Sequence, residues 1–299
     1  MIWLIGNKGM LGTQLAELLQ NETKLDFIGS DREIDITNSN IIENFLADCD
    51  KNNKKITCII NCAAYTNVNK AESDIELCEK LNITAPSYLA KAAKKHNAVL
   101  IHVSTDYVFD GKASEPYFEE MKRNPTGVYG STKAKGEEEI EKNCSDFYIF
   151  RTAWLYGKYG NNFVKTMLRL FEENGGAKVV ADQFGTPTYA KDLARSIAFF
   201  AKKIEKLPSE KPEFGIYHCT NLGKTNWYEF ACKIAELGLK YKKISKNAQV
   251  VPCKTEDYPT PAPRPAYSVL SKEKICKILD FSLPNWEESL ETYIKNDCE

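Results

Sequence analysis

The first twenty residues contain the feature that most restricts the fold, an apolar strand followed by a glycine-rich turn and an amphipathic helix. Residues 2–5 are all apolar, and Gly6, Gly9 and Gly12 follow at intervals of three. Glycines let the backbone approach a diphosphate closely, and the N-terminus of the next helix offers free N–H groups and the positive end of its dipole. The arrangement predicts a dinucleotide-binding turn. The helix has an apolar face made by Leu11, Leu15, Leu18 and Leu19.

The second predicted strand, residues 25–31, ends in an acidic residue. Asp31 follows the glycine turn by about 20 residues, where dinucleotide-binding folds hold the adenosine ribose with an acid. Such an acid favours the free 2′-hydroxyl of NADH, whereas the neighbouring Arg32 could pair with the 2′-phosphate of NADPH. The sequence therefore leaves open whether the cofactor is NADPH or NADH. Thr37 or Asn38 is expected to cap the helix that follows.

Strands and helices continue to alternate as far as residue 152. Three more apolar strands are predicted at residues 57–61, 99–104 and 147–151, with helical segments between them. This alternation is typical of an α/β fold with a doubly wound parallel sheet of the Rossmann type.

The composition changes after residue 152, where a stretch rich in aromatic residues, Gly and Asn is typical of a pocket wall. We therefore expect a dinucleotide-binding domain at residues 1–152, joined by the helix near 190–206. A smaller C-terminal α/β domain for substrate binding is expected to occupy mainly residues 153–299.

Charge and cysteine usage narrow the class of partner. The formal net charge is −1, and no basic run suggests a nucleic-acid or membrane partner. None of the 10 cysteines forms a CxxC pair, and with 3 histidines no metal pattern is predicted. No apolar run of about 20 residues is present, so no membrane span is expected. These features favour a cytoplasmic protein with reduced thiols.

Tyr129 and Lys133 are four residues apart in a predicted helix, so their side chains share one face. An ammonium lowers the pKa of a nearby phenol, which could then exchange a proton with a carbonyl oxygen. A chain this rich in Tyr and Lys contains such pairs by chance. The pair therefore indicates a catalytic site only if the rest of the chain builds a cofactor site around it. Ser104 or Thr105, at the end of the fourth strand, could donate a hydrogen bond to the same carbonyl. His102, in mid-strand, is expected to be a core histidine.

These motifs together resemble the extended short-chain dehydrogenase/reductases and, within them, the dTDP-4-dehydrorhamnose reductase family. The glycine turn and the Tyr129–Lys133 pair mark the superfamily. Two stretches are specific to the narrower family, namely Ser-Thr-Asp-Tyr-Val-Phe-Asp-Gly at 104–111 and Tyr-Pro-Thr-Pro-Ala-Pro-Arg-Pro at 258–265. Further matching stretches lie at 61–66, 70–72, 151–156, 162–163, 166–170 and 182–188.

The resemblance implies NAD(P)H-dependent reduction of the C4 ketone of dTDP-4-dehydro-L-rhamnose to dTDP-L-rhamnose. It implies Tyr129 as the general acid, Lys133 as its electrostatic partner and Thr105 as the hydrogen-bond donor to the ketone. The cofactor would contact Tyr129, Lys133 and a larger set: Gly6, Gly9, Met10, Leu11, Gly12, Asp31, Arg32, Asp35, Ile36, Ala63, Ala64, Tyr65 and Thr66. The dTDP-sugar would contact Val68, Thr105, Asp106, Tyr107, Trp154, Asn162 and Arg264.

Two alternatives stay open on the sequence alone. One is reduction of another nucleotide-4-keto-6-deoxysugar. The other is a non-catalytic regulatory subunit of the methionine adenosyltransferase type. Some relatives form dimers bridged by a metal through acidic side chains, but Gln14 and Lys191 occupy those positions here. Neither side chain is a ligand for a hard metal. A homodimer is possible, and no metal is expected.

Overall fold

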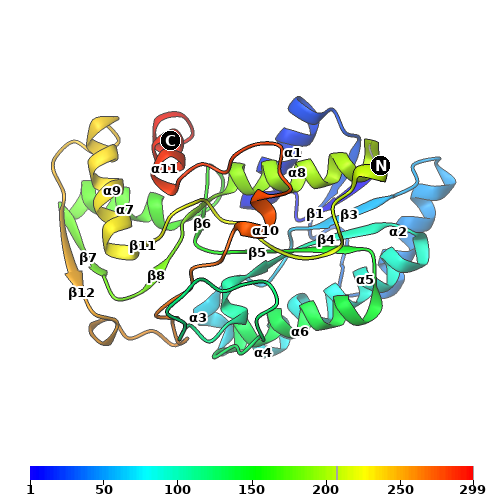
Figure 1. Cartoon of the computed structure of the whole chain (residues 1–299), viewed down its shortest axis with the longest axis horizontal. Helices are drawn as coiled ribbons and strands as arrows, with labels where there is room; N and C mark the ends of the chain where they lie inside the picture. The colour runs from blue at the N-terminus through cyan, green and yellow to red at the C-terminus, as the bar shows by residue number, and fades with distance from the viewer. Residues whose placement is uncertain (207, 299) are drawn as a thin grey trace.

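The computed structural model describes residues 1–206 and 208–298, so the second predicted domain is described as far as Cys298. Its centre is a parallel sheet with the strand order β10-β5-β4-β3-β1-β2 (Figure 1). Helices cover both faces of this sheet, which is the doubly wound architecture expected from the sequence. The strands are β1 (Ile2–Ile5), β2 (Phe27–Ser30), β3 (Cys58–Asn61), β4 (Val99–Thr105), β5 (Phe147–Thr152) and β10 (Gly215–His218).

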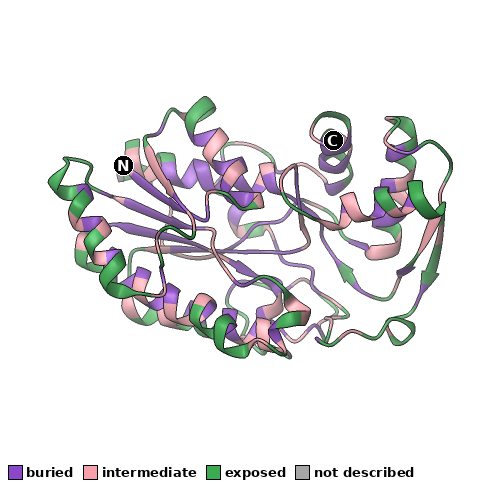
Figure 2. Cartoon of the chain, turned by 180° about the vertical axis from the view of Figure 1, so that it is seen from behind, coloured by how far each residue is buried: buried purple, intermediate pink, exposed green. Residues whose placement is uncertain are grey.

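The sheet forms because its central strands are apolar on both sides. Successive side chains of a strand point to opposite faces. Ile2 and Leu4 therefore pack under α1 (Met10–Leu18) and α8 (Ala190–Lys206), whereas Trp3 and Ile5 pack against α2 (Ser39–Lys51) and α5 (Ala85–His96). Figure 1 shows α1 and α8 on one side of the sheet, with α2, α5 and α6 (Val128–Asn143) on the other. The purple strands between outward-facing green helix surfaces in Figure 2 mark the same layers.

Short helical turns and caps connect these layers. Asn38 caps α2 by accepting hydrogen bonds from the backbone N–H groups of Asn40 and Ile41, so it and not Thr37 is the cap. A π-helical turn extends α1 through Leu19–Thr23. The remaining short elements of this half are α3 (Val68–Ala71), α4 (Ile75–Glu79), the π turn Lys80–Thr84 and the 3-10 turn Asp106–Val108.

The second half is built on aromatic packing. Tyr156, Tyr189 and Tyr293 are buried together beside Phe230. Three two-stranded ladders surround them: β6 (Leu155–Tyr156) with β9 (Thr188–Tyr189), β7 (Gly176–Val180) with β12 (Gln249–Cys253), and β8 (Phe184–Gly185) with β11 (Thr225–Asn226). The helices are α7 (Phe163–Asn174), α9 (Trp227–Lys240), α10 (Glu273–Cys276) and α11 (Trp286–Asn296), with 3-10 turns at Pro208–Glu210 and Thr255–Asp257.

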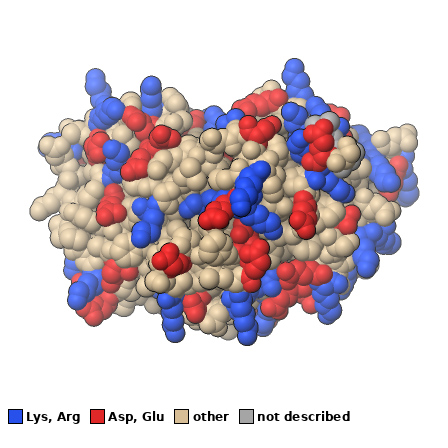
Figure 3. Space-filling model, viewed as in Figure 1, with Lys and Arg blue, Asp and Glu red and all other residues tan. Residues whose placement is uncertain are grey.

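The chain returns to the large sheet after entering the second half. Phe200 of α8 packs against Tyr148 and Phe150 of β5, and β10 pairs with β5 as the edge strand. We therefore propose that the dinucleotide-binding domain comprises residues 1–152 with α8 and β10. No helix within residues 1–206 and 208–298 has the length and apolar character needed to cross a bilayer. On the face seen in Figure 3, basic and acidic side chains are interspersed.

Candidate active site

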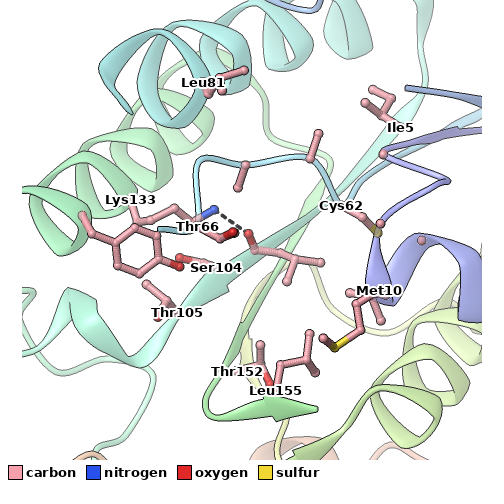
Figure 4. A pocket seen from close by; sticks show the side chains of 18 of the residues that line it. Ile5, Met10, Cys62, Thr66, Leu81, Ser104, Thr105, Lys133, Thr152 and Leu155 are labelled. Atoms are coloured by element: carbon pink, nitrogen blue, oxygen red, sulfur yellow. Dashed lines mark hydrogen bonds between the residues drawn. The ribbon is translucent and has the colours of Figure 1, made fainter. Parts of the chain in front are cut away.

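A cleft of about 960 Å³ opens at the carboxyl ends of the sheet strands. Ligands bind at this edge in open α/β sheets, because the loops that follow the strands gather there. The glycine turn after β1 forms one end of the cleft, and Tyr129 and Lys133 of α6 lie toward the other. The volume is in the range of a cofactor or nucleotide-sugar site. Figure 4 shows the lining side chains converging from several elements.

The glycine turn is shaped so that only glycine fits at its critical points. Gly6 has a positive φ of +75°, and a Cβ there would lie 2.9 Å from the backbone nitrogen of Ala63. A Cβ on Gly12 would lie 2.0 Å from the carbonyl oxygen of Gly6. The backbone is therefore compact, and the N-terminus of α1 faces the cleft through Met10 and Leu11. This geometry suits the diphosphate of a dinucleotide.

The end of the cleft next to β2 has both charges that bear on cofactor choice. Asp31 and Arg32 both line it. The backbone N–H of Asp31 donates to the Glu33 carboxylate, and Glu33 also pairs with Lys8 at 3.3 Å on the surface. Carboxylate and guanidinium groups are thus both available where a 2′-hydroxyl or a 2′-phosphate would lie. The other predicted residues of this end, Asp35 and Ile36, line the same wall.

Lys133 is 2% exposed and is held by the sheet beneath it. Its Nζ donates to the carbonyl oxygen of Val103 at 2.6 Å and lies 3.1 Å from Nε2 of His102 (the dashed line in Figure 4 starts at Lys133). Burial lowers the pKa of Lys133 to about 8. Burial also raises the pKa of Tyr129, opposed by a hydrogen bond with Thr105. The pKa of Tyr129 is therefore raised and not lowered as expected, because burial disfavours the phenolate more strongly than the hydrogen bond with Thr105 favours it.

Ser104 and Thr105 have different partners. The hydroxyl of Ser104 donates to Glu137 at 2.5 Å, and Glu137 is fully buried against Arg151. Thr105 lines the cleft, and its hydroxyl donates to Asp106 at 2.9 Å. Both residues line the cleft, and each hydroxyl already donates to a carboxylate, so Thr105 stays the predicted donor to a bound carbonyl. Burial raises the pKa of the Asp106 carboxyl to about 6.

Aromatic side chains form the wall nearest the second half of the chain. Tyr107 packs edge-on against Tyr129, with ring centroids 5.5 Å apart. Trp154 has a positive φ of +49° and stacks on Trp227 at 3.6 Å. Bulky residues rarely adopt a positive φ, so this backbone conformation is unfavourable. The stack on Trp227 holds Trp154 in it at the cleft. With Val68, Thr105 and Asp106, these side chains surround the volume in front of Tyr129.

Three predicted site residues lie outside the cleft lining. Tyr65 is buried beneath it, with its hydroxyl donating to Asp74. Asn162 caps α7, accepting from the backbone N–H of Lys165 and donating to a backbone carbonyl. Arg264 donates to Asn69 and to the hydroxyl of Tyr107, which is itself a lining residue. All other predicted cofactor and substrate residues line the cleft.

Several lining residues were not predicted. Cys62 follows β3 and Thr152 is the last residue of β5, so the rule that ligands bind at strand ends could have identified them. Leu81 and Asn161 have no local signal, because the tertiary fold alone brings them to the cleft. The others are Ile5, Lys8, Ile34, Val103, Ala153 and Leu155.

The residues at the positions of the metal ligands of some relatives have other contacts here. Gln14 is buried in α1, where its amide donates to Glu17, and Lys191 lies in the first turn of α8. Within residues 1–206 and 208–298, no group of three or more His, Cys, Asp or Glu side chains could hold a metal ion.

Comparisons with known proteins identify close relatives over nearly the whole chain. The sequence model of the family described as "RmlD substrate binding domain" matches residues 1–298. A dTDP-4-dehydrorhamnose reductase of Aggregatibacter actinomycetemcomitans is 39% identical over 288 residues, which are 96% of each chain.

Solved structures agree with this match. A dTDP-4-dehydrorhamnose reductase of Clostridium acetobutylicum is 39% identical, with a TM-score of 0.86 and 98% of each chain covered. The enzyme of the same name from Bacillus anthracis, solved in complex with NADP, is 37% identical. It has a TM-score of 0.86 and covers 98% of this chain and 97% of its own.

Proposed function

The chain belongs to the RmlD substrate-binding-domain family, and from this membership we propose that it reduces the C4 ketone of dTDP-4-dehydro-L-rhamnose to dTDP-L-rhamnose with NADPH or NADH. The observation that carries the proposal is the convergence of Thr105, Tyr129 and Lys133 on one cleft whose far end is the glycine turn. The cleft thus combines a turn that suits a dinucleotide with groups that can protonate a ketone, and the chain is an oxidoreductase.

The cofactor would be held by residues whose shapes already suit it. The turn at Gly6 and Gly12 would accept the diphosphate, because a Cβ at either position would collide with backbone atoms. Asp31 and Arg32 would meet the adenosine ribose. A bound nicotinamide supplies the hydride that adds to C4 of the sugar.

The protein's own residues handle the charge that develops on the ketone oxygen. Thr105 donates a hydrogen bond to this oxygen, and Tyr129 donates the proton that completes the alcohol. Because the Tyr129 phenol is buried, its phenolate is costly without a cation. Lys133 in its ammonium form stabilises that phenolate. The cleft walls hold the reacting groups in line.

The sugar nucleotide would lie along the aromatic wall. Asp106, Tyr107 and Trp154 would contact the sugar. Arg264 donates to the Tyr107 hydroxyl, so its guanidinium is one side chain away from the cleft and is proposed to face the diphosphate. Retention of a proton donor, a cation and a hydrogen-bond donor together favours an enzyme over the regulatory-subunit alternative, since a binding subunit has no need of all three.

The decisive experiment is a coupled assay. Purified protein is given dTDP-4-dehydrorhamnose and NADPH or NADH, cofactor oxidation is followed by absorbance, and the C4 configuration of the product is read by NMR. Tyr129→Phe should abolish turnover while leaving cofactor affinity nearly unchanged, because the phenol ring stays in place. Equal turnover by the variant would refute the proton-donor role. No turnover of any 4-keto sugar by the parent would favour the regulatory-subunit alternative.

We also propose a cytoplasmic location. All 10 cysteines are free, and Cys58 and Cys62 are only four residues apart without a bond between them. Disulfides are rare in reducing compartments and common in oxidising ones. A chain with this many unpaired thiols therefore suits a reducing compartment such as the cytoplasm.

A further inference from the structure

Beneath Lys133, two polar side chains of the sheet form a pair that the proposed reaction does not use. Asn61 ends β3, and His102 lies opposite it in the register of β4. Paired residues of neighbouring strands point to the same face. Nδ2 of Asn61 lies 3.1 Å from Nδ1 of His102, and the two residues are 0% and 1% exposed.

The orientation of the Asn61 amide is set by the backbone. The N–H of Ala63 donates to Oδ1 of Asn61 at 3.0 Å, so the amide oxygen is occupied on that side. The NH₂ group therefore faces His102, and an NH₂ group can only donate. Nδ1 of His102 must accept, which leaves the single proton of the neutral imidazole on Nε2. Burial and the neighbouring Lys133 hold the pKa of His102 well below its usual value, so the ring is neutral.

The Nε2–H of His102 then points at Lys133, 3.1 Å away. An ammonium has three donors and no acceptor, whereas a neutral amine has a lone pair that accepts. The contact is a hydrogen bond when Lys133 is an amine and brings two donors together when it is an ammonium. Val103 accepts from Nζ in either state, and because a bond from a charged donor is stronger, this contact favours the ammonium and opposes the effect of His102.

We propose that Asn61 and His102 are positioning residues that fix one imidazole tautomer against Lys133 and thereby favour its neutral amine. Protonating Lys133 then requires either two facing donors or a turn of the Asn61 amide that gives up the bond from Ala63. The consequence for the proposed reductase is that the Lys133 ammonium, which stabilises the Tyr129 phenolate, loses its proton at a lower pH than an ordinary lysine.

Other titratable groups around Lys133 do not account for this preference. Glu137, one turn along α6, favours the ammonium, but it is paired with Arg151 and Arg123. The thiols of Cys62 and Cys78 face Lys133 from the loop after β3 and from α4, and burial raises the pKa of both, so they are uncharged. The His102 ring is the side chain in direct contact with the amine. Burial lowers the pKa of Lys133 to about 8, and the facing Nε2–H of His102 acts in the same direction.

The first test reads the tautomer directly and does not depend on turnover. The chain has 3 histidines, so long-range ¹H–¹⁵N spectra of the imidazole rings can be assigned with a His102→Gln variant. The expected result is a neutral His102 with its proton on Nε2 at pH 7 to 9. A proton on Nδ1 would overturn the proposal. Because this spectrum needs no substrate, failure of the proposed reductase activity would leave it unaffected.

The second test reverses the direction of the hydrogen bond between residue 61 and Nδ1 of His102. Asn61→Asp offers an acceptor to Nδ1, so the His102 proton should move to Nδ1 and Nε2 should accept from the Lys133 ammonium. Asn61→Ala removes the donor without adding charge, and it should move the tautomer in the same direction. His102→Gln, whose amide can turn its oxygen to the ammonium, serves if the Asn61 variants do not fold.

The measured quantity is the pKa of Lys133, followed through the His102 ring shifts or, in His102→Gln, through the alkaline limb of kcat. In each variant this pKa should rise by about one unit, a tenfold change in the proton equilibrium. KM for NADPH at pH 7 should be unchanged, since a merely structural defect would alter it. An unchanged pKa in both Asn61→Ala and His102→Gln would refute the proposal.

Discussion

The buried carboxylate of Glu137 provides the sharpest test of how the catalytic helix is held. It accepts from Ser104 of β4, from Nε of Arg123 at 2.6 Å and from Nη2 of Arg151 of β5 at 2.7 Å. Glu137 is fully buried and Arg151 is 1% exposed. Replacing Glu137 with Gln leaves the buried Arg151 guanidinium without its counter-charge. Breaking such a buried pair costs about 3–5 kcal/mol.

This cost converts into a measurable shift of the unfolding temperature. An entropy of unfolding of about 2.1 cal/mol/K per residue gives about 0.6 kcal/mol/K for 299 residues. Glu137→Gln should therefore lower Tm by about 5–8 °C in calorimetry. Glu138→Gln is the matched control, because Glu138 is the next residue of the same helix and is exposed.

The pH dependence adds an independent check. Burial opposes ionisation of Glu137, but Arg151 and Arg123 outweigh it and hold its pKa below the usual value. The stabilisation is therefore present above the pKa of an unfolded Glu and is lost as the pH falls through the lowered value. The gap between parent and Glu137→Gln should close in acid. Equal Tm values for Glu137→Gln and Glu138→Gln at neutral pH would refute the reasoning.

Three further predictions concern the cleft. Gly12→Ala places a Cβ 2.0 Å from the Gly6 carbonyl oxygen, so NADPH affinity measured by fluorescence titration should fall by at least about tenfold, or 1.4 kcal/mol; wild-type affinity would contradict the compact turn. Asp31→Ala should cost NADH affinity more than NADPH affinity, and equal losses would argue against a ribose contact. Burial raises the pKa of Asp106 to about 6 from a usual 3.8, so its protonated form stabilises the fold in acid and this stabilisation is lost as the pH rises through the raised value. In urea unfolding from about pH 4 to about pH 7, Asp106→Asn should lose less stability than the parent, and parallel curves would count against this.

The parts of the fold that follow from local pattern could be predicted from the sequence. The strand, glycine turn and helix at the N-terminus depend on contacts between near neighbours, and so does the placing of Tyr129 and Lys133 on one helical face. The sequence predicts that either Thr37 or Asn38 caps the helix that follows, and the structure shows that Asn38 is the cap.

Features that depend on long-range contacts could not be predicted. The sequence of residues 215–220 is typical of a strand, but it does not indicate that this strand pairs with β5. Tyr65 and Thr66 are neighbours, yet only Thr66 lines the cleft, because the first side chain packs beneath the loop. The pKa of Tyr129 shifts opposite to expectation because spacing reports a nearby charge but says nothing of burial.

The return of the chain to its first sheet has a consequence for synthesis on the ribosome. When β5 has been made, Tyr148 and Phe150 still lack the partners that later bury them, Phe200 of α8 and Tyr217 of β10. At about 5–20 residues per second, the missing segment takes several seconds to emerge. Throughout this interval an apolar sheet face and an open strand edge are accessible to chaperones and to other nascent chains. A chain stopped near residue 152 is therefore expected to aggregate, although it contains every residue of the glycine turn and the Tyr129–Lys133 pair.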